Sequence, residues 1–321
     1  MYCIDAGSIY CPCHLAETLD CILCSQLSGG HFCQCKNWCG VCIYEKYISN
    51  GNRPNNLRKT YSCLIEEKEV IEEDLYSFVI DAPENLVREL IYPGSFVFLR
   101  KNGDPIYYDV PLSIMEADKK EKTLKVMIKT AGTKTKSLLR LNKGDYVLVR
   151  GPFSNGIMGL SNIYKAKNGV SIVAARGIGI VPSIHVMKEL HSNNNRVISI
   201  VDTQFKNNFG EKYFKEYSSE TIYCDMLEDG KLTENFRSIL EKIISENAIN
   251  IIHCGGPDIL TYNILEFADD TIRFSCCNNA KMSCGEGICA SCTKHYENDV
   301  VKRLCKVQID PRDLFKDRRL F

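Results

Sequence analysis

The sequence lacks several features that identify common classes of protein. Its 321 residues include 40 basic and 40 acidic side chains, so the formal net charge is zero, which argues against a basic nucleic-acid-binding protein. No apolar run approaches the ~18 residues of a membrane span, and the first residues carry neither the basic stretch nor the apolar run of a signal peptide. We therefore expect a cytoplasmic protein with no nucleic-acid partner and no membrane span.

Side-chain sets for nucleophilic catalysis are also missing. The six histidines are scattered, and none forms a metal-type pair such as His-x3-His. No Ser/His/Asp or Cys/His arrangement is visible. The one tryptophan, Trp38, lies in a segment poor in large aliphatic residues, where we expect it to form the small apolar core.

Cysteine is the residue in excess, with 18 in the chain. Nine lie in the first 42 residues and six lie between Cys276 and Cys305, so only Cys63, Cys224 and Cys254 occupy the long middle. Thiols stay reduced in the cytosol, where clustered cysteines bind metal more often than they form disulfides. The two dense ends therefore predict local metal sites, and the three middle cysteines are expected to be packing residues.

The chain length predicts about two domains at ~150 residues each. Residues 1–50 are a cysteine-rich module that ends in a polar linker. Residues 58–158 contain short runs rich in Val, Ile, Tyr and Phe between turn signals, a pattern typical of a small closed β barrel. The strands are expected at Ser62–Glu67, Leu75–Asp81, Ser95–Arg100, Thr123–Lys129 and Asp145–Arg150.

Residues 165–270 alternate between apolar strands and amphipathic helices. This alternation predicts a parallel sheet with helices on both faces, so the fold class is a β barrel followed by an α/β domain. The strands are expected at Val170–Ala175, Arg196–Val201 and Ala248–Cys254, and the helices at Val181–His191, Glu234–Glu246 and Ile259–Phe267.

Residues 271–321 contain the most specific motif. Cys284, Cys289, Cys292 and Cys305 have the spacing C-x4-C-x2-C-x12-C, with the first three thiolates in one loop. Four thiolates can complete a [2Fe–2S] cluster, and plant-type ferredoxins group their first three in this way. Two glycines in the loop let the backbone approach closely and direct N–H groups at sulfur. The alternative is a zinc site, which the spacing fits less well.

The segments Cys284-Gly-Glu-Gly-Ile-Cys289-Ala-Ser-Cys292 and Arg303-Leu-Cys305-Lys resemble the C-terminal loop of a known family. It comprises the electron-transfer subunit of dihydroorotate dehydrogenase and the small flavoprotein subunit of NADH-dependent reduced ferredoxin:NADP oxidoreductase, within the ferredoxin reductase-like superfamily. The resemblance covers roughly residues 60–310. It implies an FAD-binding antiparallel barrel at 58–158, an NAD(P)-binding domain at 165–270 and a [2Fe–2S]-binding tail at 271–321.

Two barrel segments resemble those that hold FAD in this family. Val110-Pro111-Leu112-Ser113-Ile114 resembles a segment whose backbone and hydroxyl contact the flavin, although it can also be read as a barrel strand alone. The stretch from Met127 to Thr135 resembles a strand that leads into a helix N-terminus, which favours pyrophosphate. Val110 or Asp109 replaces a family arginine, and Lys134 replaces a family glycine. The resemblance assigns to FAD Val110, Pro111, Leu112, Ser113, Met127, Ile128, Lys129, Gly132, Lys134 and Thr135.

Two later turns, at residues 174–182 and 254–257, resemble the nicotinamide-binding segments of this family. Both follow expected strands, where small residues let phosphates approach the backbone. Arg176 departs from the family pattern. Asp202 ends the next strand and either accepts hydrogen bonds from a ribose 2′-hydroxyl, favouring NADH, or forms an ordinary turn. Cys254 is either a nicotinamide contact or a buried structural thiol. The assigned residues are Gly177, Gly179, Pro182, Asp202, Cys254, Gly255, Gly256 and Pro257.

The N-terminal module lies outside the resemblance. A segment of ~45 residues rarely folds on its apolar core alone, so paired cysteines are the expected staples. Eight thiols predict one or more metal sites. The spacing matches no iron–sulfur or zinc pattern that we can name, so both kinds of site remain open. The candidate ligands are Cys11, Cys13, Cys21, Cys24, Cys33, Cys35, Cys39 and Cys42.

Together these features predict a flavin and iron–sulfur electron-transfer subunit. It would pass electrons between NAD(P)H, FAD, a [2Fe–2S] cluster and a partner, which is a larger dehydrogenase subunit or a ferredoxin. Two alternatives remain at this point: a free-standing NAD(P)H:ferredoxin-type reductase, and a non-enzymatic metal-binding redox sensor. The departures at Asp109, Lys134 and Arg176 favour the sensor.

Overall fold

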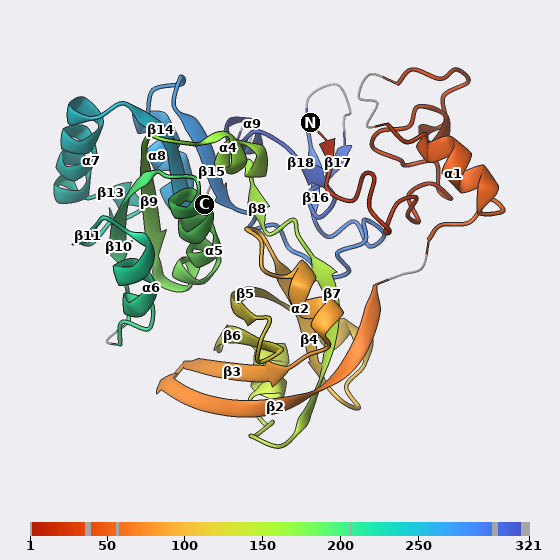
Figure 1. The fold of residues 1–321 in the computed structure, drawn as a ribbon, viewed down its shortest axis with the longest axis horizontal. Helices are drawn as coiled ribbons and strands as arrows, with labels where there is room; N and C mark the ends of the chain where they lie inside the picture. Colours follow the sequence, from red (N-terminus) through yellow and green to blue (C-terminus); the bar gives the residue numbers. More distant parts are fainter. Residues whose placement is uncertain (1, 36–39, 56–57, 206, 297–300, 316–321) are drawn as a thin grey trace. The chain divides into compact units, whose positions relative to one another are not determined.

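A computed structural model of the chain describes residues 2–35, 40–55, 58–205, 207–296 and 301–315 (Figure 1). Contacts divide the chain into two compact units, each built from segments far apart in the sequence. The first unit joins Met1–Thr60 to Ala280–Ile309 and contains the N-terminal cysteines and the four cysteines of the C-terminal motif, and the second joins Tyr61–Asn279 to Asp310–Phe321. Within the described residues, no helix has the length and apolar character needed to cross a bilayer.

Six antiparallel strands of the second unit close into a barrel in the order β2-β3-β6-β5-β4-β7, which confirms the expected barrel. The strand β5 was not among the strands expected from the turn spacing, because Pro111 near its start interrupts the strand pattern, although a barrel strand was one of the two interpretations of Val110–Ile114. The strands are β2 (Lys59–Glu72), β3 (Leu75–Asp81), β4 (Phe96–Lys101), β5 (Val110–Asp118), β6 (Thr123–Lys129) and β7 (Tyr146–Phe153), with the helices α2 (Glu84–Glu89) and α3 (Thr133–Leu138) between them.

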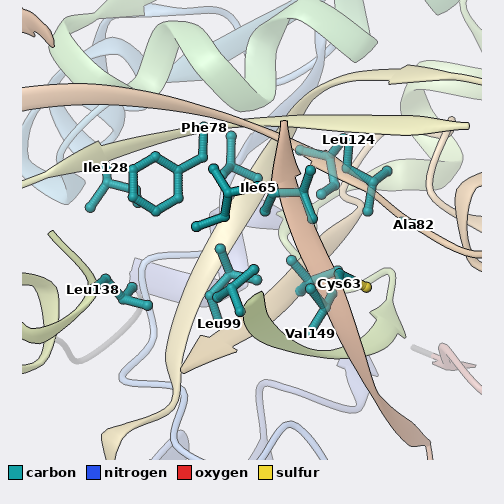
Figure 2. Close-up of a cluster of buried hydrophobic side chains, with 14 of the residues drawn as sticks. Cys63, Ile65, Phe78, Ala82, Leu99, Leu124, Ile128, Leu138 and Val149 are labelled. Carbon is teal, nitrogen blue, oxygen red and sulfur yellow. The ribbon is translucent and has the colours of Figure 1, made fainter. Parts of the chain in front are cut away.

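Apolar side chains from all parts of the barrel fill its interior (Figure 2). Phe78, Ile80, Leu99 and Val126 have no exposed surface. Successive side chains of a strand point to opposite faces, so a register slip by one residue would turn this set outward. The core therefore fixes the register of β5 and β6, whose ends carry the candidate flavin segments.

The other half of the second unit is a six-stranded sheet in the order β11-β10-β9-β14-β15-β8. Five strands are parallel, but β8 runs antiparallel to β15, so the sheet is mixed rather than purely parallel as expected. A two-residue strand is too short to give a sequence pattern. The strands are β8 (Ile157–Met158), β9 (Val170–Arg176), β10 (Arg196–Asp202), β11 (Glu220–Tyr223), β14 (Ile249–Gly255) and β15 (Arg273–Cys277).

Helices cover both faces of this sheet. The connections through α5 and α6 step from β9 toward β11, whereas those through α7 and α8 step back toward β15, and right-handed crossovers place the two pairs on opposite faces (Figure 1). The strand order reverses at β9 and β14, which creates a crevice at their carboxyl ends. The helices are α4 (Leu160–Lys165), α5 (Ile180–Ser192), α6 (Glu211–Tyr217), α7 (Glu234–Glu246), α8 (Asp258–Phe267) and α9 (Pro311–Phe315), and a small hairpin joins β12 (Leu227–Glu228) to β13 (Lys231–Leu232).

The first unit has little regular structure. Its small core contains Ala16, Cys24 and Leu27, while Trp38, expected in that core, lies outside the described residues. The described residues of this unit also form two short antiparallel pairs, a 3-10 helix and an α-helix: β1 (Tyr2–Cys3) with β18 (Val307–Gln308), β16 (Thr293–His295) with β17 (Val301–Arg303), η1 (Gln26–Ser28) and α1 (Ile43–Ser49). The β1–β18 pair ties the N-terminal segment to the residues that follow Cys305.

Candidate functional site

A cavity of about 520 Å³ in the second unit is lined by both the barrel and the sheet. It lies where the start of β5 and the end of β6 meet the turns after β9, β14 and β15. Twelve of the residues assigned from the sequence line it: Val110, Pro111, Leu112, Ser113, Met127, Lys129, Thr135, Gly177, Gly179, Pro182, Gly256 and Pro257. The structure does not place Ile128, Gly132, Lys134, Asp202, Cys254 or Gly255 in this lining.

The start of β5 offers its backbone to this cavity. β5 pairs with β4 from Val110 to Ser113, but it pairs with β6 only from Ile114 onward. The first four residues therefore have a partner strand on one side only, which leaves backbone hydrogen-bonding groups available to a ligand. The segment is both a barrel strand and a cavity wall, so the two interpretations of Pro111–Ile114 are compatible.

A turn held by Thr135 forms the barrel side of the cavity. Its hydroxyl Oγ1 accepts hydrogen bonds from the backbone N–H groups of Ala131 and Gly132, at 3.0 and 3.1 Å. This arrangement fixes the first turn of α3 directly after β6. Lys134 is not among the lining residues, and its ammonium lies 3.4 Å from the carbonyl oxygen of Asp109, directly before Val110.

Asp109 anchors the start of β5 by binding two arginines. Its carboxylate lies 2.8 Å from Nη1 of Arg100 and 2.9 Å from Nη2 of Arg150, and the residue is 2% exposed. The guanidinium of Arg150 also stacks over the rings of Phe98 and Phe153. Asp109, one of the two residues that can stand in place of the family arginine, therefore has a structural role, because its carboxylate joins β4 and β7 at the start of β5.

Two glycines bring the β9–α5 and β14–α8 turns into direct contact. A Cβ atom on Gly179 would lie 2.3 Å from the carbonyl oxygen of Gly255, and a Cβ on Gly255 would lie 2.0 Å from Oγ of Ser183. No real Cβ contact is that short. Gly177 has a φ of +56°, in the left-handed region that favours glycine. This floor of the cavity therefore depends on the absence of side chains.

Asp202 and Cys254 have structural partners instead of facing the cavity. The carboxylate of Asp202 accepts hydrogen bonds from Nε of Arg176 at 2.8 Å and from the backbone N–H of Met226 at 3.0 Å, and the residue is 4% exposed. Cys254 is fully buried and accepts a hydrogen bond from the hydroxyl of Thr261. Asp202 thus links residues 26 and 24 positions away rather than closing a local turn, and the burial of Cys254 favours its role as a structural thiol.

The four cysteines of the C-terminal motif lie in the first unit as two pairs. The thiols of Cys284 and Cys289 are hydrogen-bonded to each other, and so are those of Cys292 and Cys305. The bond from Cys305 lowers the pKa of Cys292 to about 6 and raises that of Cys305. The backbone N–H of Glu286 donates to Sγ of Cys284 at 3.3 Å, and that of Cys305 donates to Sγ of Cys292 at 3.4 Å. Each pair thus has a backbone donor directed at sulfur.

The N-terminal cysteines form two groups. Cys3, which was not a candidate ligand, lines a small cavity of about 20 Å³ together with Cys11, Cys13 and Cys21. In the second group, Sγ of Cys33 lies 3.5 Å from Sγ of Cys35, with Cys24 and Cys42 close enough to act on Cys35 electrostatically. Cys39 lies outside the described residues. Among the residues that are described, no three His, Cys, Asp or Glu side chains are spaced as ligands of one metal ion.

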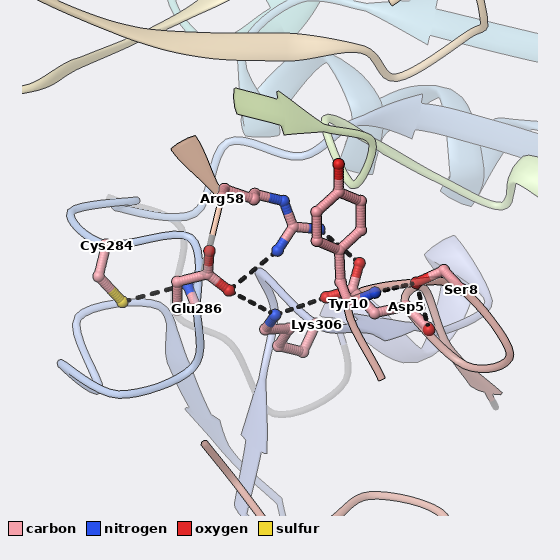
Figure 3. A network of polar contacts seen from close by, with 7 residues as sticks. All are labelled: Asp5, Ser8, Tyr10, Arg58, Cys284, Glu286 and Lys306. Atoms are coloured by element: carbon pink, nitrogen blue, oxygen red, sulfur yellow. Dashed lines mark hydrogen bonds and ion pairs between the residues drawn. The ribbon is translucent and has the colours of Figure 1, made fainter. Parts of the chain in front are cut away.

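A buried charge network, which we define as Asp5, Arg58, Glu286 and Lys306, was missed by sequence reasoning (Figure 3). Burial alone would raise the pKa of both carboxyl groups, but Lys306 and Arg58 outweigh it and hold them below their usual range. The only sequence signal is the charged Glu286 inside the glycine-rich cysteine loop.

The chain was compared with protein families, with curated proteins and with solved structures. No family model matches the chain. It is 28% identical over 254 residues to the dihydroorotate dehydrogenase B (NAD(+)) electron transfer subunit of Fusobacterium nucleatum, covering 77% of this chain and 94% of the relative. It is 30% identical over 204 residues to the probable dihydroorotate dehydrogenase B (NAD(+)) electron transfer subunit of Pyrococcus furiosus, covering 62% of this chain and 73% of the relative.

Among solved structures, an NADH-dependent reduced ferredoxin-NADP oxidoreductase is similar to this fold. Its TM-score is 0.63 at 20% identity, and the match covers 80% of this chain and 93% of that one. At this identity, the similarity shows a shared fold.

Proposed function

Because the chain belongs to the family of dihydroorotate dehydrogenase B electron-transfer subunits, we propose that it is an FAD-dependent NAD(P)H oxidoreductase subunit. It carries electrons between NAD(P)H and a partner protein, through FAD and a [2Fe–2S] cluster. The single observation that carries this proposal is the cavity of about 520 Å³. The flavin-type segment of the barrel and the nicotinamide-type turns of the sheet both line it.

Different residues around the cavity would bind FAD and the nicotinamide dinucleotide. The one-sided backbone of Val110–Ser113 and the turn held by Thr135 would hold FAD. The glycine turns at 177–179 and 255–256 would receive the nicotinamide dinucleotide, because they lie at the carboxyl ends of β9 and β14 where the strand order reverses. Bound FAD supplies the hydride and single-electron chemistry, so the protein needs no nucleophilic side chain.

The paired cysteines support the [2Fe–2S] part of the proposal. In such a cluster, each iron takes two thiolates, so the ligands are needed as two pairs rather than as one tetrahedron. Cys284 with Cys289, and Cys292 with Cys305, supply two such pairs, and backbone N–H groups already point at two of the sulfurs. A zinc site asks instead for all four thiolates around one ion.

We propose further that the N-terminal cysteines bind metal in two sets. One set is Cys3, Cys11, Cys13 and Cys21, and the other includes Cys24, Cys33, Cys35 and Cys42. Iron–sulfur and zinc both remain open for these sets. Iron–sulfur would extend the route for electrons, whereas zinc would make the module a structural element.

The partner is proposed from the relatives, which are named as electron-transfer subunits. A subunit implies a heteromer, so a larger dehydrogenase subunit is the first candidate and a ferredoxin is the second. The relatives weigh against the sensor alternative, and two of the three departures that favoured it, Asp109 and Arg176, have ion-pair partners. Oδ2 of Asp202 is bound to Arg176, so the ribose role of this carboxylate and the choice between NADH and NADPH both stay open.

Anaerobic purification followed by visible spectroscopy and by counts of iron, sulfide and zinc tests the proposal. We expect flavin bands that NADH or NADPH bleaches, together with the absorption of a [2Fe–2S] cluster. Cys292→Ser should lose the cluster signal and keep the flavin, whereas the matched control Cys224→Ser, at a half-buried cysteine of the second unit, should keep both. A colourless, zinc-containing protein without flavin would refute the assignment.

A further inference from the structure

Four charged side chains from four different segments meet in the interior of the first unit (Figure 3). Nζ of Lys306 lies 2.5 Å from Oδ2 of Asp5 and 2.9 Å from Oε2 of Glu286. Nη2 of Arg58 lies 2.5 Å from Oδ1 of Asp5, and its Nη1 lies 2.9 Å from Oε2 of Glu286. Exposure of these side chains ranges from 0% to 10%. The network therefore holds two positive and two negative charges, each paired with both opposite partners.

Stability alone is a poor explanation for this network. Buried ion pairs are costly to desolvate and are often no better than apolar packing of the same volume. The ring of Tyr10 lies 4.2 Å from the guanidinium of Arg58, so the site is also closed by an aromatic face. Such an arrangement instead specifies which segments meet and in what geometry.

Two members of the network are joined directly to the cysteine pairs. Glu286 is two residues from Cys284, and its backbone N–H donates to that sulfur. Lys306 follows Cys305, whose backbone N–H donates to Sγ of Cys292. The N-terminal segment supplies Asp5, which follows β1. This segment is held against the residues after Cys305, because β1 pairs with β18 and the N–H of Ile4 donates to the carbonyl of Lys306 at 2.8 Å.

We propose that Asp5, Arg58, Glu286 and Lys306 are positioning residues through which the N-terminal segment fixes the C-terminal cysteine loop and sets the reduction potential of the cluster there. The inference rests on the proposed [2Fe–2S] cluster. Cluster potentials depend on net charge and on hydrogen bonds to sulfur. Charges buried beside the loop are screened far less than exposed ones, so the balance of two cations and two anions holds the potential at its native value.

Opposite changes to this balance provide the test. Asp5→Asn removes a negative charge and should raise the cluster potential, whereas Lys306→Met removes a positive charge and should lower it. The double variant restores neutrality and should return toward the wild-type potential. Glu45→Gln and Lys46→Met are matched controls that remove the same charges at exposed positions of the same unit, and we expect smaller shifts from both. The potentials are measured on the full chain by an anaerobic redox titration followed by electron paramagnetic resonance.

Each outcome decides the proposal. Opposite shifts with recovery in the double variant support it, and so does selective loss of the cluster from a variant that retains its flavin. Unchanged potentials, shifts of the same sign in both single variants, or loss of flavin and cluster together would overturn it. If the wild-type chain itself binds no [2Fe–2S] cluster, the proposed function is refuted and this inference falls with it, whereas failure in a cluster-bearing wild type refutes only the inference.

Discussion

Substitution of Gly179 by alanine tests whether contact between two glycine turns builds the nicotinamide site. The new Cβ would lie 2.3 Å from the carbonyl oxygen of Gly255 and 2.6 Å from the backbone nitrogen of Gly256. Side-chain carbons essentially never approach closer than 3.0 Å, so the two turns must separate by at least about 0.7 Å. Both neighbours are backbone atoms, so no side-chain rotation can relieve the contact.

This displacement falls on the wall of the cavity where hydride transfer is proposed. A misplacement of about 1 Å can cost roughly 10²-fold in rate, and overpacking of this kind typically costs about 1–3 kcal/mol in stability. We expect Gly179→Ala to retain FAD and to lose roughly two orders of magnitude in the rate of flavin reduction by NADH or NADPH. The rate is measured by anaerobic stopped-flow absorbance and expressed per bound flavin.

Gly169→Ala is the matched control. Gly169 directly precedes β9, at the end of the strand opposite to the cavity, and a Cβ there would lie 2.5 Å from Nδ2 of Asn250. That contact is with the end of a side chain, which can move. Both variants are expected to be less stable than the wild type, but only Gly179→Ala should show slower flavin reduction. A wild-type rate per flavin in Gly179→Ala, or an equal loss in both variants, would refute the reasoning.

Two further predictions concern stability and are measured by urea unfolding. Asp109→Ala strands the guanidinium groups of Arg100 and Arg150, and removal of one partner from a buried ion pair costs about 3–5 kcal/mol; a loss below about 1 kcal/mol would contradict this role. Burial lowers the pKa of His185 from 6.5 to about 4, with Nδ1 hydrogen-bonded to the carbonyl of Ile91. Its neutral form therefore contributes stability that is complete above pH 6.5 and decreases by about 3 kcal/mol as the pH falls through 4. His185→Asn should flatten this part of the pH profile, and an unchanged slope would show that another group is responsible.

Much of the fold could be predicted because its signals are local. Sequence patterns predicted the observed bounds of β3, β6 and α7, because each segment has its own apolar periodicity. β8 was missed because two residues are too few to show a period, and β5 was anticipated only as one interpretation of Val110–Ile114 because a proline interrupts its pattern. The cavity residues were expected in the order of their motifs; for Asp202 and Cys254 the sequence left a cofactor role and a structural role open, and packing gave both of them protein partners.

The sequence by itself determined the barrel, the alternating strands and helices, and the spacing of the C-terminal cysteines, because each depends on residues near one another in the chain. Only the tertiary structure decided which charges meet. Lys306 and Asp5 are separated by 301 residues, and Arg58 and Glu286 by 228. No local pattern identifies such partners, since their pairing depends on how distant segments pack and on the need to compensate every buried charge.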